Sequence, residues 1–302
     1  MTTIAILGAT GHIGKALAAE LNGDPNTELL LYARRPNAVV GGLDITEFGE
    51  RPFDVVINAV GAGDPGRLKK IGSGIIELTE QIDNFVLRAL ENDPRALLLS
   101  LSSGAVYGTE FFSPAATQTK IEIAPNDIME KNFYAIAKLY SEVKHRALSK
   151  FNIIDLRVFS FFSRYLDLDG QFFMADLARS LMNKQTFETM PDEMVRDYTV
   201  PEDFAQLIRC CIQKWQSSRS PINTAIDVYS REPTGKFDLI DHLENEFGLI
   251  CQISEQLNSP ATGGQKSMYC SNFNKAEEWG FRPRYDSIEG IAAELTMLLE
   301  TR

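Results

Sequence analysis

The sequence predicts an α/β protein built on a doubly wound parallel sheet, with a smaller α/β lobe towards its C-terminal end. In the first half of the chain, short apolar runs alternate with longer amphipathic ones, a pattern typical of strand–helix–strand units. The apolar runs are rich in leucine and β-branched residues, as expected of strands that helices cover on both faces. A glycine-rich turn joins the first apolar run to the first amphipathic one, which is a further feature of such folds.

The expected elements follow one another in the order that right-handed crossovers require. The expected strands cover residues 4–7, 29–32, 54–60, 96–101 and 153–159. The expected helices of the first half cover residues 13–21, 75–91 and 131–150. Beyond residue 160 the alternation loosens, and helical patterns cover residues 237–247 and 288–299. We therefore expect a first domain over residues 1–160, to which later segments return, and a second lobe over residues 161–302.

The composition excludes several classes of protein. The 302 residues include 30 lysines and arginines against 41 aspartates and glutamates, a formal net charge of −11. This charge disfavours nucleic acid and anionic membrane surfaces as partners. No apolar run approaches the roughly 20 residues of a membrane helix, and we find no secretory signal. We therefore expect a cytoplasmic enzyme or binding protein whose partner is a small molecule.

The cysteines and histidines lack the spacing of a metal site, so we expect no metal. The cysteines are Cys210, Cys211, Cys251 and Cys270, and the histidines are His12, His145 and His242. Four cysteines are also too few for a disulfide framework in a chain of this length. We expect them to be buried thiols, which suits a reducing cytoplasm.

The glycine-rich turn follows the first expected strand and opens the first expected helix. Its glycines, Gly8, Gly11 and Gly14, are spaced three residues apart. Glycine lets the backbone turn sharply and approach a pyrophosphate, whose charge then meets the N–H groups of the helix N-terminus. Because the turn lies between a strand and a helix, it predicts a dinucleotide site. The residues expected to contact the cofactor here are Gly8, Thr10, Gly11, His12, Ile13 and Gly14.

The end of the second strand bears on the choice of dinucleotide. An NAD site normally carries an acidic residue there, which holds the ribose hydroxyls. This chain has Arg34 and Arg35 instead, and guanidinium groups suit a 2′-phosphate. The sequence therefore favours NADP(H) as cofactor, with NAD(H) as the alternative. Further cofactor contacts are expected at Asp44, Ile45, Ala59, Val60 and Gly61.

A tyrosine, a lysine and a serine predict the catalytic centre. Tyr134 and Lys138 are four residues apart on an expected helix, so they share one face and the ammonium favours the ionised phenol. Such a tyrosine acts as a general acid or base on a carbonyl–alcohol pair at neutral pH. Ser103, which follows an expected strand, adds a hydrogen bond to the same oxygen. A second pair with this spacing, Tyr140 and Lys144, faces another side of the helix.

With these motifs, the chain resembles the extended short-chain dehydrogenases/reductases of the NAD-dependent epimerase/dehydratase family, most of whose members act on nucleotide sugars. The resemblance runs through essentially the whole chain and implies a Rossmann fold. The matching segments are residues 8–14, 103–108, 134–142, 156–159, 196–203 and 274–281. The family commonly dimerises through helices that match residues 75–91 and 131–150, so the resemblance also implies a homodimer.

The resemblance implies roles for the site residues. Tyr134 is implied as catalytic acid and base, and Lys138 as its partner and as an anchor for the cofactor ribose. Ser103 is implied to donate a hydrogen bond to the substrate, and Arg196 to bind the pyrophosphate of a sugar nucleotide. The residues implied to contact the substrate are Ser103, Tyr107, Ser160 and Arg196.

Two departures from the family pattern concern the substrate. Ser160 stands where an asparagine is usual, and residues 262–266 lack the arginine that related enzymes often offer to a second phosphate. Lys266 or Arg164 either replaces that arginine or is an ordinary surface charge. The substrate is therefore either a nucleotide sugar bound in a different way or another compound.

Other departures narrow the reaction. Dehydratases and decarboxylases of the family place acidic residues just after the catalytic serine or threonine, whereas this chain has Gly104 and Ala105. Family epimerases usually hold NAD tightly, which Arg34 and Arg35 fit poorly. We therefore expect an NADPH-dependent ketoreductase acting on a nucleotide sugar of the 4-keto-6-deoxy type, with Tyr134 as proton donor and NADPH as hydride donor. The alternatives are an NAD-dependent nucleotide-sugar epimerase and a non-catalytic dinucleotide-sensing protein.

Overall fold

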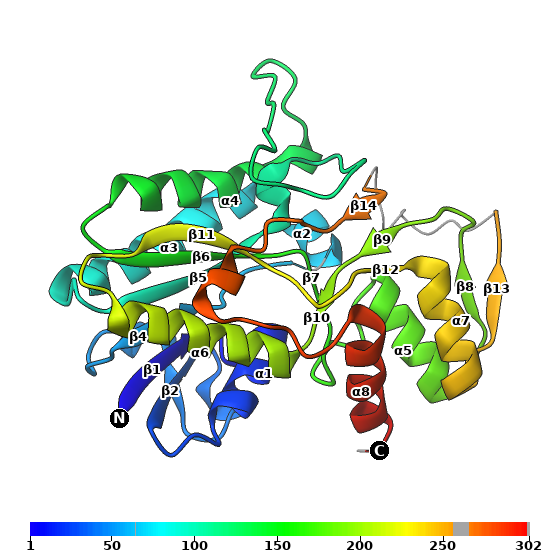
Figure 1. Cartoon of the computed structure of the whole chain (residues 1–302), viewed down its shortest axis with the longest axis horizontal. Helices are drawn as coiled ribbons and strands as arrows, with labels where there is room; N and C mark the ends of the chain where they lie inside the picture. The colour runs from blue at the N-terminus through cyan, green and yellow to red at the C-terminus, as the bar shows by residue number, and fades with distance from the viewer. Residues whose placement is uncertain (64, 256–265, 301–302) are drawn as a thin grey trace.

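The computed structural model describes residues 1–63, 65–255 and 266–300. Its centre is a parallel sheet of seven strands in the order β11-β6-β5-β4-β1-β2-β3, which helices cover on both faces (Figure 1). This confirms the predicted doubly wound fold, in which the strand order reverses between β1 and β4. The crevice outside the carboxyl ends of the strands at this reversal is where such sheets bind ligands.

The sheet and its covering helices draw on both halves of the chain. The strands are β1 (Thr2–Leu7), β2 (Thr27–Ala33), β3 (Gly42–Asp44), β4 (Val55–Asn58), β5 (Leu97–Ser103), β6 (Asn152–Val158) and β11 (Asn223–Val228). The helices are α1 (His12–Leu21), α2 (Pro65–Ile71), α3 (Gly74–Asn92), α4 (Glu130–Ala147) and α6 (Pro201–Ser217). The 3-10 turns are η1 (Pro36–Ala38), η2 (Ile45–Glu47), η3 (Gly104–Tyr107) and η4 (Lys275–Trp279).

Successive side chains along each strand point to opposite faces of the sheet, so a hydrophobic core forms on each face. In β1, Ile4 and Ile6 face the core that α1 and α6 cover, whereas Ala5 and Leu7 face the core that α3 covers. This follows from the two-residue period of a strand, and it explains why the strands of a doubly covered sheet are apolar throughout.

The predicted elements are present with ends displaced by a few residues. The strand predicted over 54–60 ends at Asn58, because the chain turns there towards α2. β3, β11, α2, α5 and α6 were not among the predicted elements. β11 and α6 return from the second half of the chain to the sheet, where β11 pairs with β6.

The second half also forms a smaller lobe beside the sheet (Figure 1). Its helices are α5 (Phe173–Asn183), α7 (Lys236–Phe247) and α8 (Ser287–Glu300). Its strands are β7 (Ser160–Phe161), β8 (Phe187–Thr189), β9 (Val195–Arg196), β10 (Tyr198–Thr199), β12 (Thr234–Gly235), β13 (Cys251–Ile253) and β14 (Met268–Tyr269). Arg164 joins the lobe to the sheet, since it forms ion pairs with Glu294 of α8 at 2.8 Å and Glu20 of α1 at 3.2 Å.

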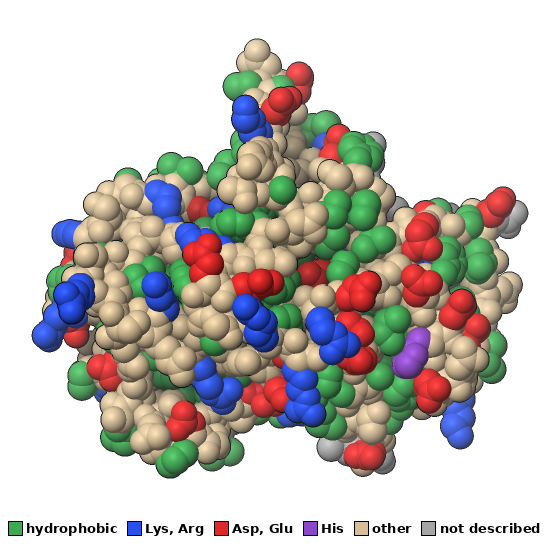
Figure 2. All heavy atoms as spheres, in the orientation of Figure 1, with side chains coloured by type: hydrophobic (Ala, Val, Ile, Leu, Met, Phe, Trp, Pro, Cys, Tyr) green, Lys and Arg blue, Asp and Glu red, His purple; other side chains and the backbone are tan. Residues whose placement is uncertain are grey.

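The surface is acidic overall but locally mixed. On the face that Figure 2 shows, basic and acidic side chains are interspersed over α6 and α8, and the segment between η3 and α4 projects from the body. None of the described helices is both long and apolar enough to cross a membrane.

A buried group of charges holds α4 against α3 and β6. His145 is fully buried, with Nδ1 2.8 Å from Asp155 of β6 and Nε2 2.7 Å from Asp83 of α3. Lys144 pairs with Asp83 at 2.5 Å, and Arg146 pairs with Asp155. Burial lowers the pKa of His145, but hydrogen bonds to both carboxylates outweigh it and raise the pKa to about 9. These five residues, which we call the His145 cluster, therefore contain an imidazolium at neutral pH.

The His145 cluster predicts that the protein loses stability in alkali. The pKa of His145 lies near 6.5 in the unfolded chain and at about 9 in the folded one. Its contribution is therefore fully present below pH 6.5 and is lost as the pH rises through 9, with a limit of about 3 kcal/mol. Denaturant unfolding across this range measures the change. The variant His145→Gln, which cannot become charged, should be less stable at pH 6.5 and should vary less with pH; an equally steep pH dependence would contradict this.

Candidate active site

The glycine-rich turn leaves β1 and enters α1. The amides of Gly8 and Ala9 both donate to the carbonyl oxygen of Tyr32 in β2, at 3.0 and 3.1 Å. Gly8 has a φ of +82°, and a Cβ there would lie 2.9 Å from the carbonyl oxygen of Ala59. A Cβ at Gly14 would lie 2.2 Å from the carbonyl oxygen of Gly8. Both positions therefore require glycine, which lets α1 begin close to β1 and β4.

The N-terminus of α1 is open to an anion. Gly11 is the N-cap residue and offers no side-chain hydrogen bond, and the first turn has no acidic residue. The first N–H groups of the helix therefore lack a side-chain acceptor, and such groups suit a phosphate. Thr10 precedes this N-terminus, and Ile13 is the second residue of the helix. The turn thus fits the pyrophosphate of the dinucleotide that the sequence predicts.

His12, the first residue of α1, contacts the lobe. Its ring packs edge-on against Phe161 of β7, with the centroids 5.1 Å apart. Burial is the main reason that the pKa of His12 falls to about 4. The side chain is therefore neutral at pH 7 and adds no charge to the site.

The ends of β2 and β3 meet at one edge of the crevice. The strands are parallel, with Ala33 beside Asp44, so Arg34, Asp44 and Ile45 lie close together. Arg34 and Arg35 are exposed, and neither forms an ion pair with any residue in the described ranges. Hydrogen bonds within the following turn lower the pKa of Asp44. The structure thus brings these predicted cofactor residues together.

The end of β4 meets the predicted lysine of α4. The side chain of Asn58 accepts a hydrogen bond from the amide of Val60 at 3.2 Å, within the turn that ends at Gly61. A Cβ at Gly61 would lie 3.9 Å from Nζ of Lys138. The same Nζ donates to the carbonyl oxygen of Leu101 in β5 at 2.8 Å. Lys138 therefore lies at the crevice, between the ends of β4 and β5.

The two tyrosine–lysine pairs of α4 have different surroundings. Tyr134 is half-buried, and Nζ of Lys138 lies 6.0 Å from the centroid of its ring. Tyr140 is exposed, and Lys144 binds Asp83 of α3. The first pair is therefore at the crevice, and the second contacts the neighbouring helix.

Ser103, at the end of β5, has a partner from the second half of the chain. Its Oγ lies 3.1 Å from the hydroxyl of Tyr269 and accepts a hydrogen bond from the amide of Ala105 at 3.2 Å. Burial is the main reason that the pKa of Tyr269 rises, and charge on Tyr134 raises it further. Tyr269 is thus near both Ser103 and Tyr134. No periodicity or motif marked it in the sequence.

Two cations lie over the ring of Tyr269. The guanidinium of Arg196 is 5.8 Å and Nζ of Lys266 is 4.1 Å from its centroid. Arg196 also donates to the backbone carbonyl of Lys266 at 2.7 Å. Burial, and then the charge of Arg196, lower the pKa of Lys266 to about 8. Lys266 is therefore no ordinary surface charge, whereas residues 262–265, which precede it, lie outside the described residues.

Tyr107 belongs to the same aromatic cluster as Tyr269, because its ring stacks on that of Phe159, whose centroid lies 5.0 Å from that of Tyr269. The hydroxyl of Tyr107 donates to Asp227 at 3.0 Å and accepts a hydrogen bond from Arg157 at 2.6 Å, so it belongs to a network between β6 and β11. Ser160 is in β7, where it pairs with Tyr198 of β10.

Comparison with known proteins gives one family. The model of the NAD-dependent epimerase/dehydratase family matches residues 4–226. No curated protein matches the sequence.

Several solved structures have the same fold. UDP-glucuronic acid 4-epimerase from Bacillus cereus, in complex with UDP-glucuronic acid and NAD, has a TM-score of 0.76 and 17% identity over 99% of this chain and 100% of that one. UDP-glucose-4-epimerase from Stenotrophomonas maltophila, with bound NAD, has a TM-score of 0.80 and 16% identity over 100% and 99%. dTDP-glucose 4,6-dehydratase from Bacillus anthracis, in complex with NAD, has a TM-score of 0.76 and 14% identity over 100% and 97%.

The family model covers most of the chain, and its match includes the glycine-rich turn, Ser103, Tyr134 and Lys138. The fold matches those of the solved structures over their whole length. The chain therefore belongs to the NAD-dependent epimerase/dehydratase family, within the extended short-chain dehydrogenases/reductases.

Proposed function

We propose that the protein is a nucleotide-sugar epimerase that keeps NAD(H) bound through turnover. The observation that carries the proposal is that α4 presents Tyr134 and Lys138 at the crevice, where Lys138 meets Gly61 beside the open N-terminus of α1. Two similar solved structures are epimerases with bound NAD. They support epimerisation over the net reduction that the sequence favoured.

The chain's own residues would manage the proton of this reaction. When bound, the nicotinamide supplies a hydride acceptor and donor for the sugar carbon. Tyr134 takes the proton of the sugar hydroxyl as the C–H bond breaks, and Nζ of Lys138 lies 6.0 Å from the centroid of its ring. Ser103 holds the same oxygen by a hydrogen bond. Tyr134 returns the proton when the C–H bond forms again, so the cycle consumes neither protons nor electrons.

The surroundings of Ser103 favour epimerisation over dehydration. A dehydratase needs an acid close to the reacting carbon, and Gly104 and Ala105 supply none. The ring of Phe159 packs directly against Gly104, and a Cβ at Gly104 would lie 2.5 Å from it. Any larger residue at 104 would displace that ring.

Replacing Tyr134 by phenylalanine tests the catalytic assignment. Tyr134→Phe should lower turnover of a nucleotide sugar by at least about a hundredfold, because it removes the group that holds the proton. The dissociation constant of the dinucleotide should change little. Tyr140→Phe, in the second pair, is the matched control and should keep its activity. Unchanged turnover in Tyr134→Phe would refute the assignment.

The second candidate is an NADPH-dependent reductase of 4-keto nucleotide sugars. It is favoured by Arg34 and Arg35, which are exposed at the end of β2 and have no acidic partner in the ranges that the structure describes. Two unpaired guanidinium groups there suit a 2′-phosphate. In this reaction Tyr134 donates a proton to the keto oxygen and must be reprotonated in every turnover.

The bound cofactor distinguishes the two candidates. We expect gently purified protein to release NAD(H) in stoichiometric amount. If Arg34 and Arg35 instead bind a 2′-phosphate, the double variant Arg34→Ala/Arg35→Ala should weaken NADPH binding by about a hundredfold and NADH binding far less, since each lost charge-assisted hydrogen bond costs about 1.5 kcal/mol. Freely exchanging NADP(H) would contradict the epimerase and support the reductase.

The proposed substrate site lies between the sheet and the lobe of residues 161–302. Arg196 and Lys266 are cations beside Tyr269, which contacts Ser103. A pyrophosphate bound by these cations would place the attached sugar towards Ser103 and Tyr134. The position of these two cations, one side chain away from Ser103, supports a sugar nucleotide as substrate.

We also infer a homodimer formed through α3 and α4, as the family resemblance implies. These helices pack side by side, and their outer faces expose Leu78, Tyr140 and Val143. Pairing with a second copy would bury these side chains in a four-helix bundle. Sedimentation at micromolar concentration should give a dimer, and Val143→Glu should shift it to monomer. A monomeric wild type would contradict the inference.

A further inference from the structure

Aromatic packing fixes the position of Tyr269 beside Ser103. Tyr269 is only 8% exposed. Its ring meets that of Phe111 edge-on, with the centroids 4.8 Å apart, and its centroid lies 5.0 Å from that of Phe159. Its hydroxyl lies 3.1 Å from Oγ of Ser103. The phenol is therefore held by its neighbours in contact with the serine that is proposed to hold the sugar oxygen.

The hydrogen bond between these two hydroxyls runs from Tyr269 to Ser103. Among the residues that the structure describes, Oγ of Ser103 is the only acceptor within hydrogen-bonding distance of the Tyr269 hydroxyl. A buried O–H group without an acceptor is costly, so the Tyr269 proton lies in this bond. Burial raises the pKa of Tyr269, so the phenol keeps its proton at neutral pH. Tyr269 therefore acts as a donor to Ser103.

Two donors then occupy the oxygen of Ser103. A serine hydroxyl accepts two hydrogen bonds and donates one. The amide of Ala105 donates to Oγ of Ser103 at 3.2 Å, and the hydroxyl of Tyr269 fills the second acceptor position. The proton of Ser103 is therefore available to an acceptor outside this group, such as the oxygen of a bound sugar.

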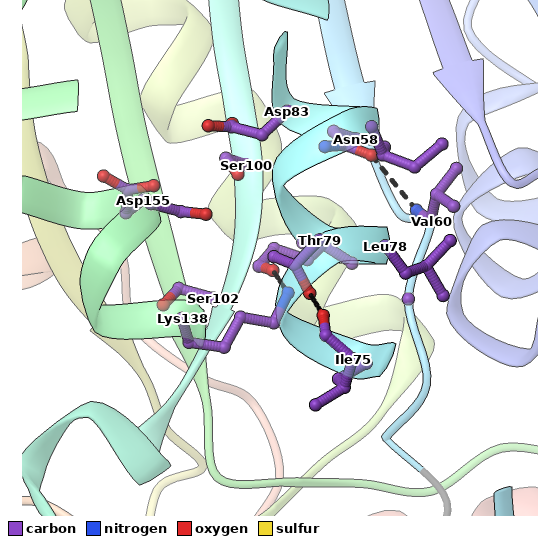
Figure 3. Close-up of a pocket in the computed structure, with 14 residues that line it drawn as sticks. Asn58, Val60, Ile75, Leu78, Thr79, Asp83, Ser100, Ser102, Lys138 and Asp155 are labelled. Carbon is purple, nitrogen blue, oxygen red and sulfur yellow. Dashed lines mark hydrogen bonds between the residues drawn. The ribbon is translucent and has the colours of Figure 1, made fainter. Parts of the chain in front are cut away.

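Other contacts hold the backbone of β5 next to Ser103. Ser102 donates to Glu142 of α4 at 2.6 Å, and Lys138 donates to the carbonyl oxygen of Leu101 at 2.8 Å. Ser102 and Lys138 line the same small cavity, of about 20 Å³, between β5, α3 and α4 (Figure 3). These contacts fix the end of the strand, but they do not fix the direction of the Ser103 O–H bond. That direction depends on the partners of Oγ itself.

We propose that Tyr269 is a positioning residue, which orients the Ser103 hydroxyl so that Ser103 donates its proton to the reacting oxygen of the sugar. This inference rests on the proposed function, because it takes Ser103 as the group that holds the sugar oxygen. Tyr269 makes and breaks no covalent bond, and its proton stays on the phenol. A donor that already points at the oxygen needs no reorganisation when charge develops there, which is why such donors accelerate reactions.

Tyr269→Phe removes the hydroxyl and keeps the ring next to Arg196 and Lys266, so it separates orientation from substrate binding. The probes are UDP-glucose and UDP-glucuronic acid, added to the dinucleotide-loaded protein, and kcat and KM are measured for each. We expect kcat to fall by about tenfold, the effect of losing one hydrogen bond in the transition state. KM should change little, because both cations and the ring remain. A residue that only supported the fold of the site would change KM as well.

A double variant shows whether Tyr269 acts through Ser103. Ser103→Ala alone should lower kcat by about a hundredfold, as the loss of a donor to the reacting oxygen does. Adding Tyr269→Phe to Ser103→Ala should lower kcat no further, because the hydroxyl that Tyr269 orients is already absent. Tyr229→Phe is the matched control and should keep the wild-type kcat. Tyr229 is also buried, but its ring packs against Phe281, with the centroids 5.3 Å apart.

A thiol at position 103 reports the donation from Tyr269 without any turnover. In Ser103→Cys, the pH dependence of alkylation at position 103, followed by mass spectrometry, gives the pKa of the thiol. A hydrogen bond from Tyr269 stabilises the thiolate, so adding Tyr269→Phe should raise the pKa of this thiol by about one. Adding Tyr229→Phe should leave it unchanged.

The outcomes separate this inference from the proposed function. A wild-type kcat in Tyr269→Phe, or a further loss of kcat in the double variant, would overturn the inference and leave the epimerase standing. A wild-type protein that turns over neither probe would contradict the epimerase, and the thiol would then decide the inference alone. A pKa that rises with Tyr269→Phe would support the donation to position 103, and an unchanged pKa would overturn it.

Discussion

The position of α4 against the sheet is the constraint on which the site depends, and buried charges set it. Lys138, Glu142 and His145 lie on one face of this helix, at the spacing of successive turns. Lys138 donates to a carbonyl of β5, Glu142 binds Ser102 at 2.6 Å, and His145 bridges α3 and β6. Each turn of the helix is therefore held by a different polar contact. Tyr134 continues this face one turn further, so its place at the crevice follows from the anchoring of the rest.

These polar contacts restrain the position of α4 along the sheet more strongly than apolar packing alone would. A helix held by leucines can slide by a fraction of a turn at small cost, whereas a buried imidazolium between two carboxylates loses its hydrogen bonds if it moves. Glycine allows a comparably close approach of α1, since a Cβ at Gly14 would lie 2.2 Å from the carbonyl oxygen of Gly8 at the end of β1. The glycine-rich turn and α4 are thus both packed closely against one sheet.

The sequence predicted those elements and motifs whose residues lie close together in the chain. The first-half strands and helices, the glycine-rich turn and the Tyr134–Lys138 pair all follow from periodicity or spacing within a few residues. β11 and α6 could not be found in this way, because their place in the first domain depends on contacts across the chain. Tyr269 meets Ser103 from 166 residues away, and His145 read alone was a scattered histidine. The role of each becomes visible only in the folded chain, where Asp83 and Asp155 meet His145 and Ser103 meets Tyr269.

The fate of one proton separates the two candidate reactions. In epimerisation Tyr134 returns the proton to the oxygen from which it took it, so the site needs no proton from outside during turnover. In net reduction Tyr134 gives up one proton per cycle, and a covered site must be resupplied each time. The arginines at the end of β2 bear on the same question, because a 2′-phosphate bound there would favour the reductase, which consumes that proton.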